Sequence, residues 1–228
     1  AVRWQPMSST APYDPSGPPW LIAPGARFLA MRDTRGVAIV DPATLTKRWH
    51  FASPGQNVAY SAWAVDSKAR WLAIGATNGM VSLADPATGR LRRLLPGPAS
   101  ETHWLQFAGD GAWLAAGSED GSVWVWQRDD DFAVGRRLQI GTPVKDVSVD
   151  PATGLVRVND EDSVAVWQLS GVGEGDRAAL PRTPLFRHSQ EIPLFSSDLH
   201  AASGLLASAS IDGEVRLWRL PGTPIRIG

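Results

Sequence analysis

Short apolar runs alternate with tight polar turns along most of this chain. The most regular example is an apolar run at residues 113–117 and a β-branched and aromatic run at 123–126, which flank the turn Asp120-Gly121. An Asp-Gly pair between two such runs favours a β-hairpin, because Gly adopts positive φ without the steric cost of a Cβ atom. We therefore predict two antiparallel strands at 113–117 and 123–126.

This hairpin pattern occurs five times. The five turns are Arg35-Gly36, Asn78-Gly79, Asp120-Gly121, Asp162-Ser163 and Asp212-Gly213. Counted from the second residue of each turn (36, 79, 121, 163 and 213), the spacings are 43, 42, 42 and 50 residues. A period of roughly 40–45 residues with four short strands is typical of a β-propeller. The sequence therefore predicts an all-β fold in which five four-stranded blades are visible.

From about residue 20 to residue 227 the chain resembles the WD-repeat β-propeller family. The best match is the last copy, LLASASIDGEVRLW at 205–218, with His188 upstream. In that family a His, a strand Ser or Thr, a turn Asp and a Trp form a structural hydrogen-bonded set. The resemblance implies these roles for His188, Ser208 or Ser210, Asp212 and Trp218.

The copies depart from the family pattern in different ways. Trp126 and Trp167 are followed by Gln and Trp218 by Arg, so the Asp that ends the family motif is missing there. The first two copies instead keep that residue, as Asp41 and Asp85, but lack the Trp before it. Only the last copy has the His. The repeats are therefore divergent.

The blades are expected at about residues 20–51, 57–95, 102–139, 144–186 and 192–227. Residues 1–19 contain five prolines and are predicted to be a linker or a stray closing strand, and residues 170–184 a surface insertion. Seven blades would need about 290 residues. Hence either five blades close on themselves, or the chain is part of a larger, seven-bladed propeller that missing residues or another chain complete. The absence of an initiator Met and the strand-like residues 2–5 favour a piece of a longer protein.

Charge and composition exclude several classes of function. The chain has 22 Lys and Arg against 23 Asp and Glu, which argues against a broad nucleic-acid or anionic-membrane surface. It contains no Cys, so thiolate chemistry and disulfides are impossible. No apolar run approaches the ~18 residues of a membrane span, and no signal-peptide pattern opens the chain. We expect a cytoplasmic protein that binds neither nucleic acid nor membranes.

Catalytic patterns are weak. None of the four His residues has a partner at metal-ligand spacing. The best acidic candidates for a central channel are Asp146 and Asp198, and two carboxylates make a poor cation site. We therefore expect no catalytic residue, no metal and no cofactor.

A rigid ring that displays loops favours a protein-interaction or sensor module, and in a longer protein this module would regulate an effector domain. The family resemblance implies that partners, whether a protein or another domain of the same polypeptide, bind where the innermost strands begin. The candidate contacts there are Asn57, Tyr60, Thr102, Trp104, Lys145, Asp146, Gln190 and Glu191. One alternative is a small-molecule or carbohydrate-binding ring, which would repeat one exposed Trp in every copy. Another is a propeller hydrolase, which would need convergent His, Asp and Glu residues. The sequence shows neither pattern.

Overall fold

The computed structural model describes residues 20–33, 35–109, 111–129, 131–169, 183–220 and 223–225. The predicted linker or strand at 1–19 and nearly all of the predicted insertion at 170–184 lie outside these residues. In these ranges no helix is long and apolar enough to cross a bilayer.

Five antiparallel sheets of four strands each form the described part of the chain, which confirms the predicted all-β fold. Blade one comprises β1 (Trp20–Ile22), β2 (Leu29–Asp33), β3 (Gly36–Val40) and β4 (Lys47–Ala52). Blade two comprises β5 (Tyr60–Val65), β6 (Leu72–Ala76), β7 (Val81–Asp85) and β8 (Arg90–Leu95). Blade three comprises β9 (Thr102–Ala108), β10 (Trp113–Ser118), β11 (Ser122–Gln127) and β12 (Gly135–Gln139). Blade four comprises β13 (Asp146–Val149), β14 (Leu155–Asn159), β15 (Ser163–Gln168) and β16 (Phe186–Ser189). Blade five comprises β17 (Leu194–His200), β18 (Leu205–Ser210), β19 (Val215–Arg219) and β20 (Thr223–Ile225). Two 3-10 helices, η1 (Pro24–Ala26) and η2 (Ala201–Ser203), lie in strand connections.

The repeated hairpin forms the centre of each blade. In blade three, β10 and β11 pair from Trp113 opposite Gln127 to Gly117 opposite Val123. Gly121 has a φ of 72°, as the turn requires. A carboxylate oxygen of Asp120 accepts a hydrogen bond from the Ser122 amide at 2.9 Å and stabilises the turn from inside.

In blades one and two the retained Asp residues hold the next turn of the blade. Asp41 Oδ1 accepts hydrogen bonds from the backbone amides of Ala43 (2.8 Å) and Thr44 (3.2 Å), and Asp41 Oδ2 accepts one from Arg48. Asp85 makes the same set of contacts one repeat later, including a bond from Arg92 at 2.7 Å. The Arg48 guanidinium, followed by the two amides, holds the pKa of Asp41 below its usual value. In these blades the Asp of the Asx-type turn takes the position that follows the Trp in later repeats, where Gln127, Gln168 and Arg219 lie.

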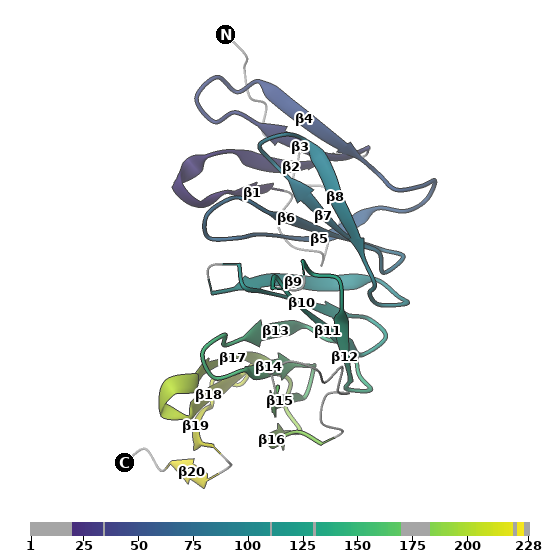
Figure 1. Cartoon of the computed structure of the whole chain (residues 1–228). Coiled ribbons are helices and arrows are strands. Elements are labelled where there is room, and N and C mark those ends of the chain that lie inside the picture. Colours follow the sequence, from purple (N-terminus) through teal and green to yellow (C-terminus); the bar gives the residue numbers. More distant parts are fainter. Residues whose placement is uncertain are drawn as a thin grey trace.

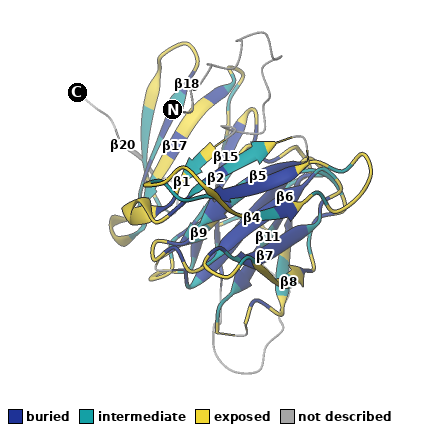
Figure 2. Ribbon diagram, turned by 90° about the horizontal axis from the view of Figure 1, so that it is seen from above, coloured by how far each residue is buried: buried dark blue, intermediate teal, exposed yellow. Residues whose placement is uncertain are grey.

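The core lies between the blades. Four hydrophobic clusters are found in the described residues, and each one joins two neighbouring blades. Between blades two and three, for example, Val81 and Leu83 pack with Leu105 and Leu114. Burying such a side chain contributes about 1.5–3 kcal/mol relative to leaving it exposed. Figure 2 shows the central strands β6, β7 and β11 buried between their neighbours.

The blades stack in sequence order, with blade one and blade five at opposite ends (Figure 1). No hydrophobic cluster in the described ranges connects blade five to blade one. The array is therefore open across the residues that the structure describes.

Candidate functional site

The predicted contact residues lie along one edge of the array, at the beginning of the inner strands β5, β9, β13 and β17. The register places each beginning beside the central hairpin turn of its own blade, because Thr102 pairs with Ser118 and Asp146 pairs with Asn159. We call this edge the loop face. Two families of loops meet there: the connections that lead into the inner strands, and the central hairpin turns.

Two of the predicted contacts are covered by the chain itself. The Tyr60 side chain is buried, and its hydroxyl donates a hydrogen bond to the Ala52 carbonyl at 2.9 Å. Thr102 is fully buried, and its methyl group packs against the backbone of Gly75 in blade two. A Cβ atom added at Gly75 would lie only 2.7 Å from this methyl carbon. The Thr102 carbonyl accepts a hydrogen bond from the Ser61 hydroxyl at 2.8 Å. These two side chains stabilise the junctions between blades, and we leave them out of the proposed contact set.

Three of the predicted contacts at blades two, three and four are accessible. Asn57 lies in the loop before β5 with a φ of 60°, a left-handed conformation that Asn tolerates. Trp104, on β9, is 38% exposed, although most of the strand around it is packed between blades. The exposed Lys145 ammonium lies 3.6 Å from a Glu161 carboxylate oxygen. Exposed aromatic and charged side chains on one face suit a protein contact.

Asp146 is held by a buried guanidinium. Arg157, on β14, is 5% exposed, and its Nη2 lies 2.7 Å from Asp146 Oδ2. The same guanidinium donates hydrogen bonds to the hydroxyls of Ser148 (3.1 Å) and Ser197 (3.0 Å). Since Ser197 belongs to β17, this network joins blade four to blade five. The sequence analysis did not single out Arg157; its only signal was a basic residue within an otherwise apolar strand.

The two acidic candidates for a central channel lie on different blades, Asp146 on β13 and Asp198 on β17. Asp198, the second channel candidate, lies on β17 and accepts a hydrogen bond from the Leu199 amide at 2.9 Å. No group of three or more His, Cys, Asp and Glu side chains in the described ranges is arranged to hold a metal ion.

Gln190 and Glu191 line an open hollow of about 550 Å³ at the junction of blades four and five. One wall is the connection from β16 to β17, and the other is the β18–β19 hairpin with Asp212, Glu214 and Arg216. Arg216 donates hydrogen bonds to both carboxylate oxygens of Glu214, at 2.9 and 2.7 Å. Seven of the eight lining residues are polar or charged in type, and the eighth is Ile192.

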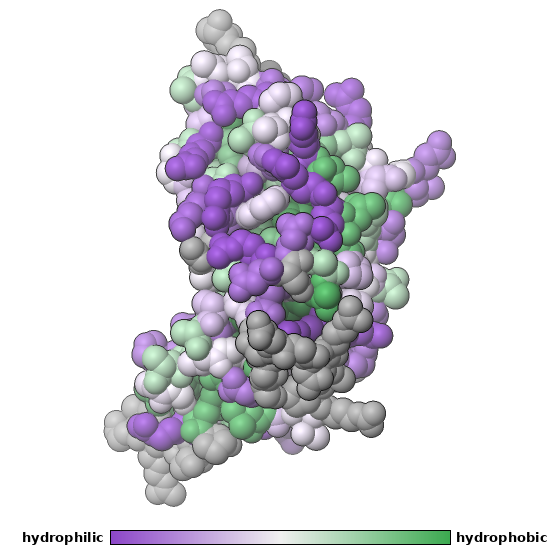
Figure 3. Space-filling view, in the orientation of Figure 1, coloured by the Kyte–Doolittle hydropathy of each residue, from purple (hydrophilic) through white to green (hydrophobic). Residues whose placement is uncertain are grey.

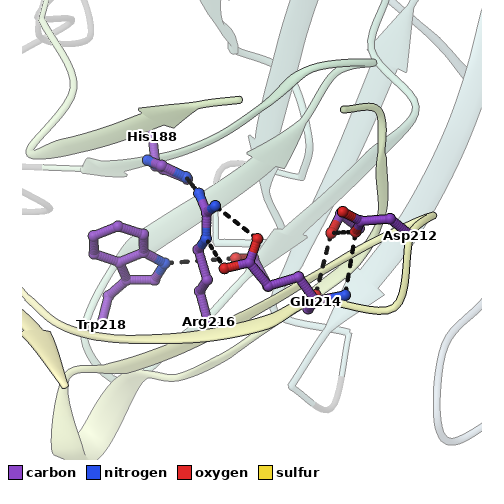
Figure 4. Close-up of polar contacts among 7 residues, drawn as sticks. His188, Asp212, Glu214, Arg216 and Trp218 are labelled. Carbon is purple, nitrogen blue, oxygen red and sulfur yellow. Dashed lines mark hydrogen bonds and ion pairs between the residues drawn. The ribbon is translucent and has the colours of Figure 1, made fainter. Parts of the chain in front are cut away.

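The residues of the family's structural set lie beside this hollow (Figure 4). The Trp218 indole donates a hydrogen bond to the Ser208 hydroxyl at 3.5 Å, and its ring lies 4.4 Å from the His188 ring, centroid to centroid. His188 Nε2 accepts a hydrogen bond from Arg216 Nη1 at 2.9 Å. Burial, followed by the Arg216 charge, lowers the pKa of His188.

The hydrogen-bond partners of Asp212 lie in its own turn. Its Oδ1 accepts hydrogen bonds from the Ser210 hydroxyl and from the Glu214 amide, the latter at 3.2 Å. The structure thus brings His188, Ser208 and Trp218 together and places Asp212 with Ser210 in the turn. Arg216 takes the position beside His188, which the family resemblance did not imply.

Comparison with known proteins identifies one family model. The model described as "WD domain, G-beta repeat" matches residues 89–127. This segment runs from β8 of blade two through β9, β10 and β11 of blade three. The sequence repeat is therefore offset by one strand from the structural blade.

Three curated relatives match longer segments. The chain is 27% identical over 117 residues to the target of rapamycin complex subunit wat1 of Schizosaccharomyces pombe, covering 51% of this chain and 34% of the relative. It is 27% identical over 205 residues to the GATOR2 complex protein Wdr24 of Drosophila melanogaster, covering 86% of this chain and 25% of the relative. It is 32% identical over 123 residues to the WD repeat-containing protein SL1-17 of Schistosoma mansoni, covering 53% and 40%. The chain thus spans between a quarter and two fifths of these relatives' lengths.

Solved structures share the fold. A chain of the mitotic checkpoint complex superposes with a TM-score of 0.67 at 14% identity, over 87% of this chain and 59% of that chain. The computationally designed Ika8 protein superposes with a TM-score of 0.62 at 19% identity, over 86% and 56%. Together with the repeated hairpins and the four-stranded blades, these matches show a WD40-type repeat at residues 89–127 and the fold of a β-propeller.

Proposed function

We propose that this chain is a non-catalytic protein-interaction module that binds a protein partner, or another domain of its own polypeptide, through the loop face. The observation that carries this proposal is the exposed Trp104 side chain near the start of β9. Aromatic side chains that become desolvated on binding dominate the energetics of many protein interfaces. Two of the relatives are named as members of protein complexes, which supports a scaffold role.

The contact set we propose consists of the accessible members of the loop face. They are Asn57, Trp104, Lys145 and Glu191, with the partly exposed Asp146 and Gln190 at the rim. Lys145 lies near Glu161 and Asp146 near Arg157. Charged side chains at the rim of an interface steer and orient a partner more than they add affinity. Trp104 supplies the apolar anchor.

We further propose a regulatory role within a longer cytoplasmic protein, in which the propeller senses a partner and controls an effector domain. Most of each relative's length lies outside the segment that matches this chain, which leaves room for such a domain. A carbohydrate site receives less support, because the eight residues that line the hollow include no aromatic ring on which a sugar could stack.

The test is affinity capture from lysate of the source cells, quantified by mass spectrometry. The double variant Trp104→Ala with Lys145→Ala is expected to lose a captured partner by about tenfold or more, which corresponds to about 1.4 kcal/mol or more. Its melting temperature is expected to fall only slightly, because Lys145 is exposed and Trp104 is partly exposed.

A matched control changes Arg90 and Leu91 to Ala on the outer strand β8, where both side chains are exposed. This control is expected to capture the partner as the parent does. Equal capture by the loop-face variant and the parent would show that this face is not the contact surface.

A further inference from the structure

Blade five exposes apolar side chains on the loop face, beside the hollow. Phe195 is 78% exposed, Ile211 is 63% exposed and Ile192, which lines the hollow, is 40% exposed. The Ile211 amide donates a hydrogen bond to the Pro193 carbonyl at 3.2 Å, so the β18–β19 turn lies against the connection that leads into β17. Phe195 lies two residues after Pro193, near the start of β17. We call Ile192, Phe195 and Ile211 the apolar patch.

The fold does not require an apolar residue in the β18–β19 turn. Blades two, three and four have Thr77, Glu119 and Glu161 at the position that Ile211 occupies in blade five. Both Glu side chains are exposed, although a further blade follows each of them. Exposure is therefore a property of this turn position, and an apolar side chain there is a feature of blade five.

The same contrast holds for Phe195. It lies at the irregular pairing near the start of its inner strand, and Ser61 and His103 lie at the corresponding pairings of β5 and β9. The Ser61 hydroxyl donates a hydrogen bond to the Thr102 carbonyl, and His103 Nε2 lies 3.0 Å from a Glu119 carboxylate oxygen. Blade five has an exposed ring where these blades have polar side chains. Exposed apolar side chains that gather in one place mark an interaction surface.

The space-filling view shows a difference between the blades on one side of the molecule. Hydrophilic side chains cover most of the upper blades in Figure 3, whereas apolar side chains reach the surface over β18 and β19. Blade five is thus the blade at which apolar contacts with a partner are most readily made.

The neighbouring hollow sets the charge of the ligand. Its charged lining consists of three carboxylates and one guanidinium, those of Glu191, Asp212, Glu214 and Arg216. The Arg216 guanidinium is bonded to both carboxylate oxygens of Glu214. The hydrogen bond from the Ser210 hydroxyl, followed by that from the Glu214 amide, lowers the pKa of Asp212 and keeps it ionised. Glu191 is exposed and forms no ion pair within the described ranges. The hollow therefore has an excess of negative charge.

One repeat position distinguishes the hollow from the junction of blades two and three. Arg216 lies two residues before Trp218, and blade three has Trp124 at the same distance before Trp126. The rings of Trp124 and Trp126 stack with their centroids 6.1 Å apart. A guanidinium does not fill the space of an indole ring, and the junction of blades four and five retains about 550 Å³ of open volume. Ligand pockets typically measure about 300–1,000 Å³.

We infer that the apolar patch and the hollow together bind a short basic segment of a protein partner. An apolar side chain of this segment covers the patch, and a Lys or Arg side chain enters the hollow beside Glu191 and Asp212. The apolar contact supplies affinity, and the carboxylates select the sign of the charge. The same carboxylates repel nucleic acid and anionic lipid, whose phosphates are negative. The inference rests on the proposed function, because both features belong to the loop face.

Phage-displayed random peptides are the probe, because they sample both signs of charge. They are selected against the 228-residue chain, and the selected sequences are compared with the unselected library. We expect enrichment of Lys or Arg close to Leu, Ile, Phe or Val, and depletion of Asp and Glu. Fluorescence anisotropy then gives the Kd of the best selected peptide for the parent and for each variant.

The apolar patch is tested with residue types that other repeats already have. Ile211→Glu introduces the residue type of blades three and four, and Phe195→His introduces that of blade three. The double variant should bind the best peptide about tenfold more weakly, or worse, because the apolar anchor is lost. Leu94→Glu is the matched control, since Leu94 is 54% exposed on the outer strand β8. This control should bind the peptide as the parent does, and both variants should melt like the parent.

The charge is tested separately with Glu191→Gln. This variant should bind the best peptide about threefold more weakly, because a charge at the rim mainly steers the approach of a ligand. The dependence of its Kd on salt should also be smaller than that of the parent.

Enrichment of acidic or uncharged peptides, or no enrichment, would overturn the inference. Equal affinity of the best peptide for the parent and for the Phe195→His, Ile211→Glu variant would do the same. The proposed function is judged separately, by lysate capture with the Trp104→Ala, Lys145→Ala variant. Lost capture there, with peptides that ignore the apolar patch, would refute this inference alone. Unchanged capture there, with peptides that depend on the patch, would instead refute the Trp104 contact.

Discussion

Gly117 tests how tightly the blades are packed. It lies on β10 opposite Val123, on the side that faces blade four. A Cβ atom at this position would lie 2.4 Å from Val144 Cγ1 and 2.9 Å from Val144 Cβ. Val144 is fully buried in the cluster between blades three and four, so its side chain has no solvent into which it can turn.

The cost of Gly117→Ala follows from this geometry. Forcing one methyl group into a packed core costs about 1–3 kcal/mol. Gly117 is outside the left-handed region, so Ala adds no backbone strain there, and the stiffer unfolded chain returns about 0.4–1 kcal/mol. We expect a net loss of about 1–2 kcal/mol in the free energy of unfolding.

A double-mutant cycle identifies the source of that loss. Val144→Ala alone should cost about 1–3 kcal/mol, because it removes buried methyl groups and leaves a cavity. In the double variant the Val144 Cγ1 atom that would clash is gone. The stability loss of the double variant should therefore be smaller, by about 1 kcal/mol, than the sum of the two single losses. Urea unfolding, followed by tryptophan fluorescence and by far-UV circular dichroism, gives the three values.

The control is Gly55→Ala, where the added Cβ would lie 3.6 Å from the nearest atom, Val58 Cγ2, an ordinary contact. We expect little change or a slight gain in stability for this variant. If Gly117→Ala unfolds like Gly55→Ala, or if the cycle is strictly additive, blades three and four are not packed as described.

Two further predictions concern the junction of blades four and five. Arg157→Leu should lower the free energy of unfolding by up to about 3 kcal/mol, because it leaves the partly exposed Asp146 and the buried Ser197 without their common donor. Asp146→Asn keeps an acceptor oxygen for Arg157, so it should lower the free energy of unfolding by less than Arg157→Leu does in the same urea titration. The pKa of His188 is lowered in the folded state by burial and by the Arg216 charge, so the unfolded chain binds this proton more readily. The contribution of neutral His188 to the free energy of unfolding is therefore complete above pH 6.5 and is lost as the pH falls below that value. The variant His188→Gln should show a smaller fall in melting temperature between pH 7.5 and pH 5.5 than the parent. An equal fall in both proteins would show that protonation of His188 does not affect stability.

Much of the fold could be predicted because its signal is local. The turn pairs and the Val residues after them repeat at nearly constant spacing, so they specify hairpins and a blade period from neighbouring residues alone.

The parts that could not be predicted depend on contacts between blades. Thr102 occupies the same kind of position as Trp104 in the sequence, but the backbone of Gly75 in the preceding blade lies against it and buries it. Arg157 donates a hydrogen bond to the Ser197 hydroxyl, which lies 40 residues away in the sequence. No local sequence pattern predicts such a pair. His188 was assigned a role by resemblance, whereas its closest polar partner is Arg216 from a strand of the next blade.

The most direct test of the interaction account is site-specific photo-crosslinking at the loop face. A benzophenone amino acid replaces Trp104 in one variant and the exposed Leu91 of the outer strand in another, and both are irradiated in source cells. The account predicts a crosslinked product of defined mass from position 104 that is absent from position 91. Products from position 91 alone, or the same products from both positions, would contradict it.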